Sequence, residues 1–568
     1  MTARREEAWW PGDIRQPVRL EDVAAGGWTH ETDVAVVGFG GAGVCAALEA
    51  REGGLEVLAL DRFDGGGATR INGGVYYAGG GTATQVEAGV TDTAKDMFDY
   101  LRQEVQGVVL DETLVRFCRG SVADHAWLAG HGVAFNARLY EEKTSYPPTD
   151  YYLYHSDSSL AQSYAARARP AARGHRVHMP AENKADGYGK GFFDPLRDAA
   201  LRSGVQVLTQ TTVEALILDD QGRVAGLEAR QAPADAPSAR TRLKLISSIR
   251  ALTSVPPAMP GAAWMARRAD KLRQRLRRID EAEGRLLRIR ARRGVVIAAG
   301  GHVFNREMIR AFSPDYLKGL PLGTPGDDGS GVALGLTAGG AMTGMDRISA
   351  WRFINPPFSW ARAPMVNAAG ARFIDETLYG AALGKAMCDG RDGKAWVILD
   401  RALMAAARAE AGAPGVLPFQ KWPALAAMLL GRKKARDLEG LARRCGFDPA
   451  VFKQAVALHN DVAAGRIADP FHKRASDAAA LTSGPFYAVD VSIDAAFFPL
   501  PTLTLGGLKV DEATGQVLRP DETGVGGLYA AGRSAVGVCS NLYVSGLSVA
   551  DCVFSGRRAA KSLMSGGG

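Results

Sequence analysis

The stretch VAVVGFGGAG, residues 34–43, decides the fold of this chain. Its four apolar residues predict a buried strand, and Gly38, Gly40 and Gly43 follow in the spacing G-x-G-x-x-G before a helix-forming run. The first glycine permits a tight turn, the second lets a pyrophosphate approach the backbone, and the third lets helix and strand pack closely. A second apolar strand ends at Asp61, where an acid holds a ribose hydroxyl. We therefore predict a Rossmann-like α/β unit with dinucleotide phosphates at the helix N-terminus.

Composition narrows the class of protein. The 568 residues suffice for two or three domains, and a 46% hydrophobic content is ordinary for a globular protein. The six cysteines form no C-x-x-C pair, which argues against a zinc or iron–sulfur site and a disulfide framework, so we expect no metal. The first residues lack an apolar signal core, and no apolar run of about 18 residues could span a membrane. We expect a cytoplasmic protein.

The positive charge is concentrated in one segment. Residues 240–293 hold 16 Lys/Arg and 4 Asp/Glu, a net charge of +12, whereas the other 514 residues sum to −5. The segment belongs to an apparent insertion, 232–293, whose part 267–293 has leucines and an isoleucine at helical spacing between arginines. This pattern predicts a basic amphipathic helix that brings 243–293 to an anionic membrane surface. A protein or oligomer contact and a solvated hairpin stay open, whereas the chain has no nucleic-acid-binding motif.

Glycines mark three further places along the chain. Eight of the 17 residues in 65–81 are glycine, a composition that excludes a helix or a regular strand and favours backbone lying against a ligand. The apolar strands 292–301 and 527–533 both end in glycine, and a last helix is expected over 547–563.

In their order these pieces resemble the fumarate reductase-like flavoproteins. The resemblance rests on the first motif, the glycine-rich stretch, GVVIAAGG, GTPGDDGSG and GGLYAAGR, and it covers most of 32–305 and 485–565. It implies FAD, held by a Rossmann-like domain built from both ends of the chain, with an α+β catalytic cap inserted between them. The implied segments are an N-terminal arm (1–31), a first FAD-binding part (32–305), the cap (306–484) and a second FAD-binding part (485–568).

The resemblance also implies which residues contact FAD. No histidine lies between residues 31 and 124, where the common covalent attachment occurs, so we expect noncovalent FAD. The expected contacts are Gly38, Gly40, Gly41, Ala42, Gly43, Asp61, Arg62, Gly67, Ala68, Thr69, Gly73, Gly74, Val213, Ala299, Gly300, Asp328, Gly532, Arg533, Leu547, Ser548 and Val549. The last three begin the final helix, whose dipole would stabilise reduced flavin.

Within that family, the chain looks most like the 3-ketosteroid dehydrogenases of the Δ4-(5α) type. The likeness rests on RFIDETLYG (372–380) and CSNLYVSGLSVAD (539–551). The Δ1 enzymes place Tyr-x-x-x-Gly in the second segment, but here Gly546 lies three residues after Tyr543. The likeness implies removal of a proton from C4 and a hydride from C5 of a 3-ketosteroid, forming the Δ4-3-ketone. A Δ1-dehydrogenase, an enone (fumarate-like) reductase and a membrane-attached electron-transfer flavoprotein remain alternatives.

The same likeness assigns catalytic roles. Ser545 matches the base, Tyr543 and Tyr379 match the relay that carries its proton away, and backbone N–H groups near Gly546 would hold the ketone oxygen. An external acceptor, quinone-like or of another kind, would reoxidise the flavin. The aromatic stretch 351–360 suits a flat apolar substrate, and the cap arginines lack the histidine of a dicarboxylate clamp.

Overall fold

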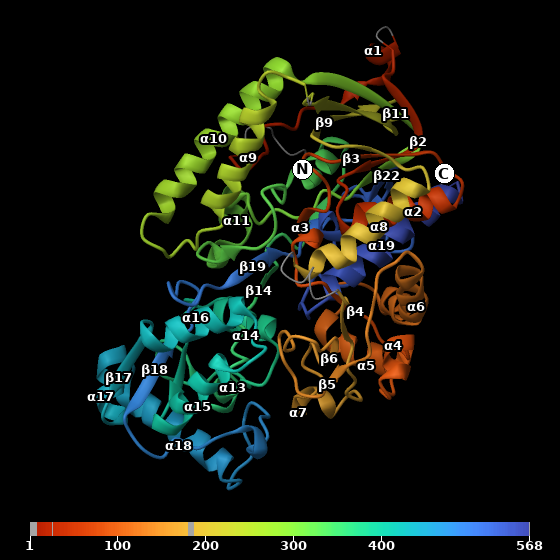
Figure 1. The fold of residues 1–568 in the computed structure, drawn as a ribbon. Coiled ribbons are helices and arrows are strands. Elements are labelled where there is room, and N and C mark those ends of the chain that lie inside the picture. The colour runs from red at the N-terminus through yellow and green to blue at the C-terminus, as the bar shows by residue number, and fades with distance from the viewer. Residues whose placement is uncertain (1–7, 25–26, 180–186, 234, 567–568) are drawn as a thin grey trace.

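The fold was described from a computed structural model that covers residues 8–24, 27–179, 187–233 and 235–566 (Figure 1). A large sheet with helices on its faces lies at one end of the molecule. A smaller mixed unit and a separate α/β lobe lie at the other end (Figure 1). Among the described residues no helix is long and apolar enough to cross a membrane.

The large sheet joins both ends of the chain. Its main path runs β1-β9-β10-β11-β2-β3-β8, and β22 pairs parallel with β11 and antiparallel with β21. The strands are β1 (Val18–Arg19), β2 (His30–Val37), β3 (Val57–Leu60), β8 (Gln206–Leu208), β9 (Thr211–Leu218), β10 (Val224–Gln231), β11 (Arg285–Ile297), β21 (Gln516–Leu518) and β22 (Gly524–Ala530). The parallel run β22-β11-β2-β3-β8 is the predicted Rossmann-like unit.

The helices that cover this sheet come from distant parts of the chain. They are α1 (Leu20–Ala24), α2 (Gly41–Glu52), α3 (Gly67–Arg70), α8 (Tyr188–Arg202), α11 (Arg306–Phe312), α12 (Ser330–Thr337) and α19 (Leu547–Met564). The final helix α19 packs on α2 so closely that a Cβ on Gly556 would lie 2.5 Å from the Ala42 carbonyl oxygen. The first and last parts of the chain are therefore one structural unit.

Strand β11 replaces part of the expected basic helix. Helix α9 (Ala239–Thr253) and helix α10 (Ala262–Glu283) form a hairpin, but Arg285 already belongs to β11. The prediction of a helix through residue 293 was wrong. Leu287, Ile289 and Ala291 are buried and alternate with more exposed arginines, which is the period of a strand. The insertion between β10 and β11 is thus residues 232–284.

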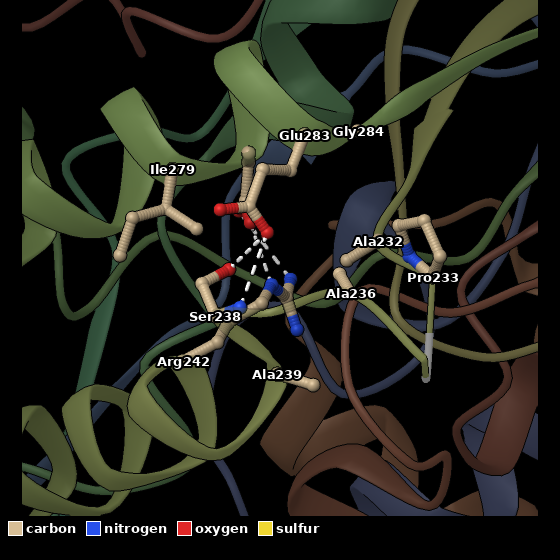
Figure 2. Close-up of a pocket in the computed structure, with 10 residues that line it drawn as sticks. Ala232, Pro233, Ala236, Ser238, Ala239, Arg242, Ile279, Glu283 and Gly284 are labelled. Carbon is tan, nitrogen blue, oxygen red and sulfur yellow. Dashed lines mark hydrogen bonds and ion pairs between the residues drawn. The ribbon is translucent and has the colours of Figure 1, made fainter.

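The base of the hairpin is fixed by polar contacts around a small cavity of about 10 Å³. Figure 2 shows the Ser238 hydroxyl donating to Glu283 at 2.5 Å, and Arg242 pairs with Asp280 at 2.6 Å. Farther along α10, Arg277 pairs with Asp13 of the N-terminal arm at 2.5 Å. The hairpin is therefore attached to the sheet at a defined angle, and its base cavity is too small for an organic ligand.

The prediction for the glycine-rich stretch also needs correction. It contains the short helix α3 and the strand β4 (Val75–Tyr77), because most of its glycines lie outside these two elements. The N-terminal arm is attached to the large sheet, since Trp9 and Ile14 are buried and β1 pairs with β9. Residues 1–7 and 25–26 of the arm lie outside the described part of the chain.

A second unit holds the sheet β4-β7-β6-β5 and its helices. Its elements are α4 (Ala83–Glu87), α5 (Ala94–Val105), α6 (Asp111–Gly130), β5 (Leu139–Tyr140), β6 (Leu153–Tyr154), α7 (Gln162–Ala165) and β7 (Gly174–Arg176). The buried Arg173 joins its parts through Asp92 at 2.7 Å. Strand β4 lies against the start of α19, because the Tyr77 amide donates to the Gly546 carbonyl at 3.3 Å.

The cap is built on the antiparallel sheet β15-β16-β18-β17. Its elements are α13 (Phe358–Arg362), β15 (Met365–Val366), α14 (Gly380–Cys388), β16 (Trp396–Leu399), α15 (Arg401–Gly412), α16 (Pro418–Leu429), β17 (Arg432–Ala435), α17 (Leu438–Cys445), α18 (Pro449–Ala463) and β18 (Phe486–Asp490). Short strands β12 (Leu320–Pro321), β14 (Ile348–Ala350) and β19 (Pro501–Thr504) join it to the large sheet, together with β13 (Met342–Thr343) and β20 (Gly507–Leu508).

The packing suggests other domain boundaries than 306 and 485. Val332 and Met345 are buried in the same apolar cluster as Val213 of the large sheet, and β18 pairs with β16 inside the cap. We therefore propose that the cap extends from about residue 351 to about residue 500.

Candidate active site

The first glycine motif forms a cradle that side chains would fill. Gly38 has a φ of +94°, and a Cβ there would lie 2.6 Å from the Ala298 carbonyl oxygen. A Cβ on Gly43 would lie 1.9 Å from the Gly38 oxygen. By contrast, a Cβ on Gly40 would meet no atom nearer than the Gly66 oxygen at 3.8 Å. The space in front of Gly40 at the start of α2 therefore fits the pyrophosphate of a dinucleotide.

Asp61 is oriented by backbone amides. Its carboxylate accepts hydrogen bonds from Phe39 at 2.9 Å, Phe63 at 2.8 Å and Gly65 at 3.2 Å. These bonds tie the end of β3 to the turn after β2. A carboxylate has about four acceptor positions, so this arrangement leaves capacity for the ribose hydroxyl expected there. Asp61 as the ribose ligand stays a prediction.

The segment between β3 and β4 lies across the same cradle. A Cβ on Gly67 would lie 3.8 Å from Gly40 Cα, and Thr69 accepts from the Gly41 amide at 3.2 Å. Gly73 and Gly74 lie farther along, where added Cβ atoms would approach the ring of Tyr146 and the Cβ of Tyr188 within 2.6 Å. This segment, which also contains Ala68, thus connects the cradle to a group of aromatic side chains.

The loop 323–331 contributes a buried acid that sequence reasoning missed. Asp327 accepts from Arg533 at 2.7 Å and from the amides of Gly301 at 3.1 Å and Thr324 at 2.8 Å. The predicted contact Asp328 pairs instead with Arg62 at 2.5 Å. Two adjacent aspartates, Asp327 and Asp328, indicate that the loop has two acidic roles. The sequence does not indicate which of the two is buried.

The remaining predicted cofactor contacts lie at the edge of the same sheet or at α19. Ala299 and Gly300 follow β11, Gly532 follows β22, and Val213 lies in β9. Leu547, Ser548 and Val549 form the first turn of α19. The structure therefore brings most of the set to the carboxyl ends of the parallel strands, where a doubly wound sheet binds ligands.

Gly546 is the residue before α19 and adopts a φ of +89°. A Cβ there would lie 2.7 Å from the Tyr77 amide nitrogen. The Leu547 amide donates to the Val544 carbonyl at 3.1 Å, and no side chain in the described part of the chain caps the helix, so the positive end of its dipole is left without a side-chain partner. This turn is suited to hold a developing negative charge.

Ser545 lies among tyrosines from three parts of the chain. Its Oγ accepts a hydrogen bond from the hydroxyl of Tyr154 at 3.3 Å, and its amide donates to the Ser156 carbonyl at 3.2 Å. Burial raises the pKa of Tyr146 to about 12, and the Ser545 hydroxyl offsets part of that shift. Burial likewise raises the pKa of Tyr379 well above its usual value, with Ser545 again acting in the opposite direction.

Tyr379 and Tyr543 enclose the same space from the cap and from the C-terminal segment. The hydroxyl of Tyr379 is buried and makes no well-formed hydrogen bond to a described residue, which leaves it able to interact with Ser545 or with a ligand. Tyr543 stacks on Trp351, with ring centroids 4.7 Å apart, and Phe353 meets Tyr379 edge-on at 5.7 Å. The site is therefore an aromatic slot with one serine hydroxyl among several phenols.

Sequence reasoning identified Ser545, Tyr543 and Tyr379, and the structure brings them together. It missed Tyr154 and Tyr146, which lie in a segment that carries many tyrosines without a recognisable motif. Of the aromatic stretch 351–360, Trp351 reaches the slot, whereas Trp360 is buried in the cap core.

The cap arginines serve the fold. Arg372 pairs with Glu376 and Asp469, both at 2.9 Å, in a buried network that includes Lys473. Arg352 donates to two backbone carbonyls of residues 492–498. Guanidinium groups that already donate to buried structural partners are poorly suited to clamp a dicarboxylate. Among the described residues no group of His, Cys, Asp and Glu is suited to a metal ion.

Known proteins that resemble this chain include steroid dehydrogenases. A family model described as "FAD binding domain" matches residues 33–546. The chain is 37% identical over 509 residues to the 3-oxo-5-alpha-steroid 4-dehydrogenase of Comamonas testosteroni, covering 89% of this chain and 93% of that protein. It is 24% identical over 594 residues to the 3-oxosteroid 1-dehydrogenase of Mycolicibacterium smegmatis, covering 90% and 94%.

A solved structure of a related enzyme has a similar fold. The 3-ketosteroid-delta4-(5alpha)-dehydrogenase from Rhodococcus jostii RHA1, determined in complex with 4-androstene-3,17-dione, matches with a TM-score of 0.79. The two chains are 28% identical, and the match covers 97% of this chain and 100% of that one. The comparisons confirm the predicted α/β fold class and FAD as the cofactor.

Proposed function

This chain belongs to the family defined by the FAD-binding domain, and we propose that it is a 3-oxo-5α-steroid 4-dehydrogenase. The proposed reaction removes a proton from C4 and a hydride from C5 of a 3-ketosteroid, leaving a C4–C5 double bond conjugated to the ketone. The observation that carries the proposal is the position of Ser545 among buried phenols at the start of α19.

FAD, held by the cradle around Gly40, supplies a two-electron acceptor for the hydride. The chain supplies the proton chemistry. Ser545 Oγ takes the C4 proton while its own proton passes to a neighbouring phenol. Because burial raises the pKa values of Tyr543, Tyr379 and Tyr146, these phenols relay a proton without resting as phenolates. The amides near Gly546 hold the ketone oxygen as enolate charge develops.

The testing experiment is anaerobic mixing of the FAD-loaded protein with a 5α-3-oxosteroid. We expect the visible flavin absorbance to bleach and the product to carry a C4–C5 double bond. A C1–C2 double bond would assign the chain to the Δ1 class instead. If the flavin stays oxidised although steroid is present, the steroid proposal is wrong, and reduction by a quinol would then favour an electron-transfer flavoprotein.

Reoxidation requires an electron acceptor outside this chain, and we propose a quinone-like molecule. We also propose that the hairpin brings the protein to an anionic membrane surface. Trp264, Arg267, Lys271, Arg275 and Arg278 recur every three or four residues along α10 and therefore lie on one face.

That face is exposed and its charges are not neutralised. Trp264 is 61% exposed, and none of the four cations pairs with a carboxylate of the described residues. An exposed basic face with a tryptophan is typical of helices that lie on anionic lipid. The triple variant Arg267→Gln/Lys271→Gln/Arg275→Gln should lose most of its binding to phosphatidylglycerol vesicles. Unchanged binding would favour the solvated hairpin, and a changed oligomeric state would favour a protein contact.

A further inference from the structure

Helix α16 of the cap turns an apolar face outward. Phe419, Trp422, Leu429 and Leu430 are 54%, 63%, 66% and 60% exposed. Their spacings of three, seven and one residues, taken through the C-cap Leu430, place them on one side of the helix. The opposite side of the helix packs against the cap core, where Ala424, Ala427 and Met428 are buried. We call the four exposed residues the α16 face. Soluble proteins rarely leave such a continuous apolar patch in water.

Positive charges lie within and directly after the segment that carries the α16 face. The segment 418–434 contains Lys421, Arg432, Lys433 and Lys434 and no acidic residue. None of these four cations pairs with a carboxylate in the part of the chain that the structure describes. Lys421 lies over the ring of Trp422 at 5.5 Å, so the apolar and cationic groups are in direct contact. An apolar helix followed by lysines and arginine combines the two attractions of an anionic lipid surface.

The α16 face is continuous with the substrate slot. Phe419 meets Tyr146 edge-on, with ring centroids 5.1 Å apart. Tyr146 in turn meets Phe353 at 6.1 Å and lies beside the Ser545 hydroxyl. A row of aromatic rings therefore leads from the outside of the cap to the proposed base.

The geometry points to the α16 face as a membrane-docking portal, through which an apolar substrate passes from an anionic lipid bilayer into the slot. The lipid contact stands on the exposure and charge of α16. The route for substrate rests in addition on the proposed steroid chemistry. Trp422 and the two leucines enter the interface, and the lysines and Arg432 contact the headgroups.

A second copy of the chain is a less suitable occupant. In a two-fold contact the same patch meets itself. The cationic rim of 421–434 would then face an identical cationic rim without an acid to neutralise it, which is unfavourable. A bilayer with anionic headgroups satisfies the apolar face and its rim together.

The test is cosedimentation of the FAD-loaded full chain with vesicles of phosphatidylcholine and phosphatidylglycerol, compared with pure phosphatidylcholine. We expect binding to the anionic vesicles. Leu429→Ser/Leu430→Ser should weaken it roughly tenfold or more, because both side chains leave the lipid. Lys433→Gln/Lys434→Gln should weaken it and reduce its dependence on salt.

The matched control is Leu110→Ser/Leu201→Ser, which removes two leucines of comparable exposure outside the cap. Equal binding by the control and the α16 variant would overturn the proposal, as would a loss of dimerisation without any change in vesicle binding. Turnover separates this proposal from the enzymatic one. Steroid oxidation without vesicle binding would refute the portal and the membrane role of the hairpin but not the enzymatic function. Vesicle binding without steroid oxidation would refute the enzymatic function but not the lipid contact.

For the route itself, the α16 variant should lose activity on steroid supplied in anionic vesicles and keep its activity on the same steroid dissolved with cyclodextrin. Equal losses in the two assays would show that α16 supports the cap and does not form a portal.

Discussion

The ring of Tyr543 lies almost flat on the indole of Trp351, with an interplanar angle of 21°. This contact joins the C-terminal segment to the cap, because Tyr543 precedes α19 and Trp351 follows β14. The Trp351 indole N–H also donates to the hydroxyl of Ser349 at 2.7 Å. One wall of the slot is thus fixed from both sides, and the Tyr543 ring has a packing role that is separable from its hydroxyl.

Tyr543→Phe tests that separation. The ring stays on Trp351, so the melting temperature should change little, whereas loss of the hydroxyl should lower the rate of flavin reduction by about 100-fold. Stopped-flow flavin absorbance and thermal unfolding give the two measurements. Trp351→Phe is the matched variant, since it alters the stack without removing a phenol. If Tyr543→Phe reduces the flavin at the wild-type rate, Tyr543 is only a packing residue.

Ser545→Ala should abolish most of the activity and leave the site folded. In this variant the Tyr154 hydroxyl can still donate to the Ser145 carbonyl at 3.2 Å, so no buried donor is left without an acceptor. We expect kcat to fall about 100-fold to 10,000-fold while FAD content is unchanged. Ser562→Ala serves as the control because that serine lies near the other end of α19, away from the site. Equal loss in both variants would contradict a base role for Ser545.

Gly546→Ala should destabilise the protein through its backbone. The residue has a left-handed φ and would place a methyl group against β4, so we expect a loss of more than about 2 kcal/mol in the free energy of unfolding. Gly107 has a φ of +76° but open space around it. Gly107→Ala should therefore cost only about 1 kcal/mol. Chemical denaturation measures both losses. If the two variants lose similar amounts of unfolding free energy, the contact between Gly546 and β4 is loose.

Glu104 should give the stability a measurable pH dependence. Burial raises its pKa to about 7 from a usual value of 4.5, although the hydroxyl of Tyr100 acts in the opposite direction. The folded state therefore binds this proton more tightly than the unfolded state. The contribution to stability is complete below pH 4.5 and is lost as the pH rises through 7.

Glu104→Gln should flatten the curve of unfolding free energy against pH over that range. The carbonyl of Glu104 accepts from the Asn541 side chain at 2.7 Å, so the titration is adjacent to the segment that carries Ser545. An unchanged slope in Glu104→Gln would mean that other buried acids, such as Asp124, set the dependence.

The parts of the fold that could be predicted from sequence are those set by neighbouring residues. Gly38 and Gly43 must be glycine because a Cβ would collide with backbone a few residues away or at the end of the adjacent strand. Their spacing was therefore enough to predict β2 and α2. Ser545 and Tyr543 share one short segment and were therefore found together. Tyr154 reaches Ser545 across 391 positions of the chain, and only the folded sheet β4-β7-β6-β5 brings them together.

The prediction for residues 285–293 was wrong because their many arginines obscured the alternating pattern of a strand. In 285–293 the arginines suggested a continuation of the amphipathic helix, although Leu287 and Ile289 already alternate as in a strand. That strand is half-buried, and its arginines find partners on neighbouring strands, such as Arg288 with Glu228 at 3.0 Å. A positively charged residue in a strand destabilises the sheet little when the adjacent strand supplies a negatively charged partner.

The packing of α19 against α2 sets an order of events during synthesis. Strand β2 and α2 leave the ribosome early, but the surface that covers α2 is encoded in the last residues of the chain. The cap sheet β15-β16-β18-β17 has all its strands before residue 491 and can pair while the first domain still waits for α19. A nascent chain would thus expose an incomplete nucleotide fold until α19 has been synthesised. Cofactor capture should then follow the synthesis of α19.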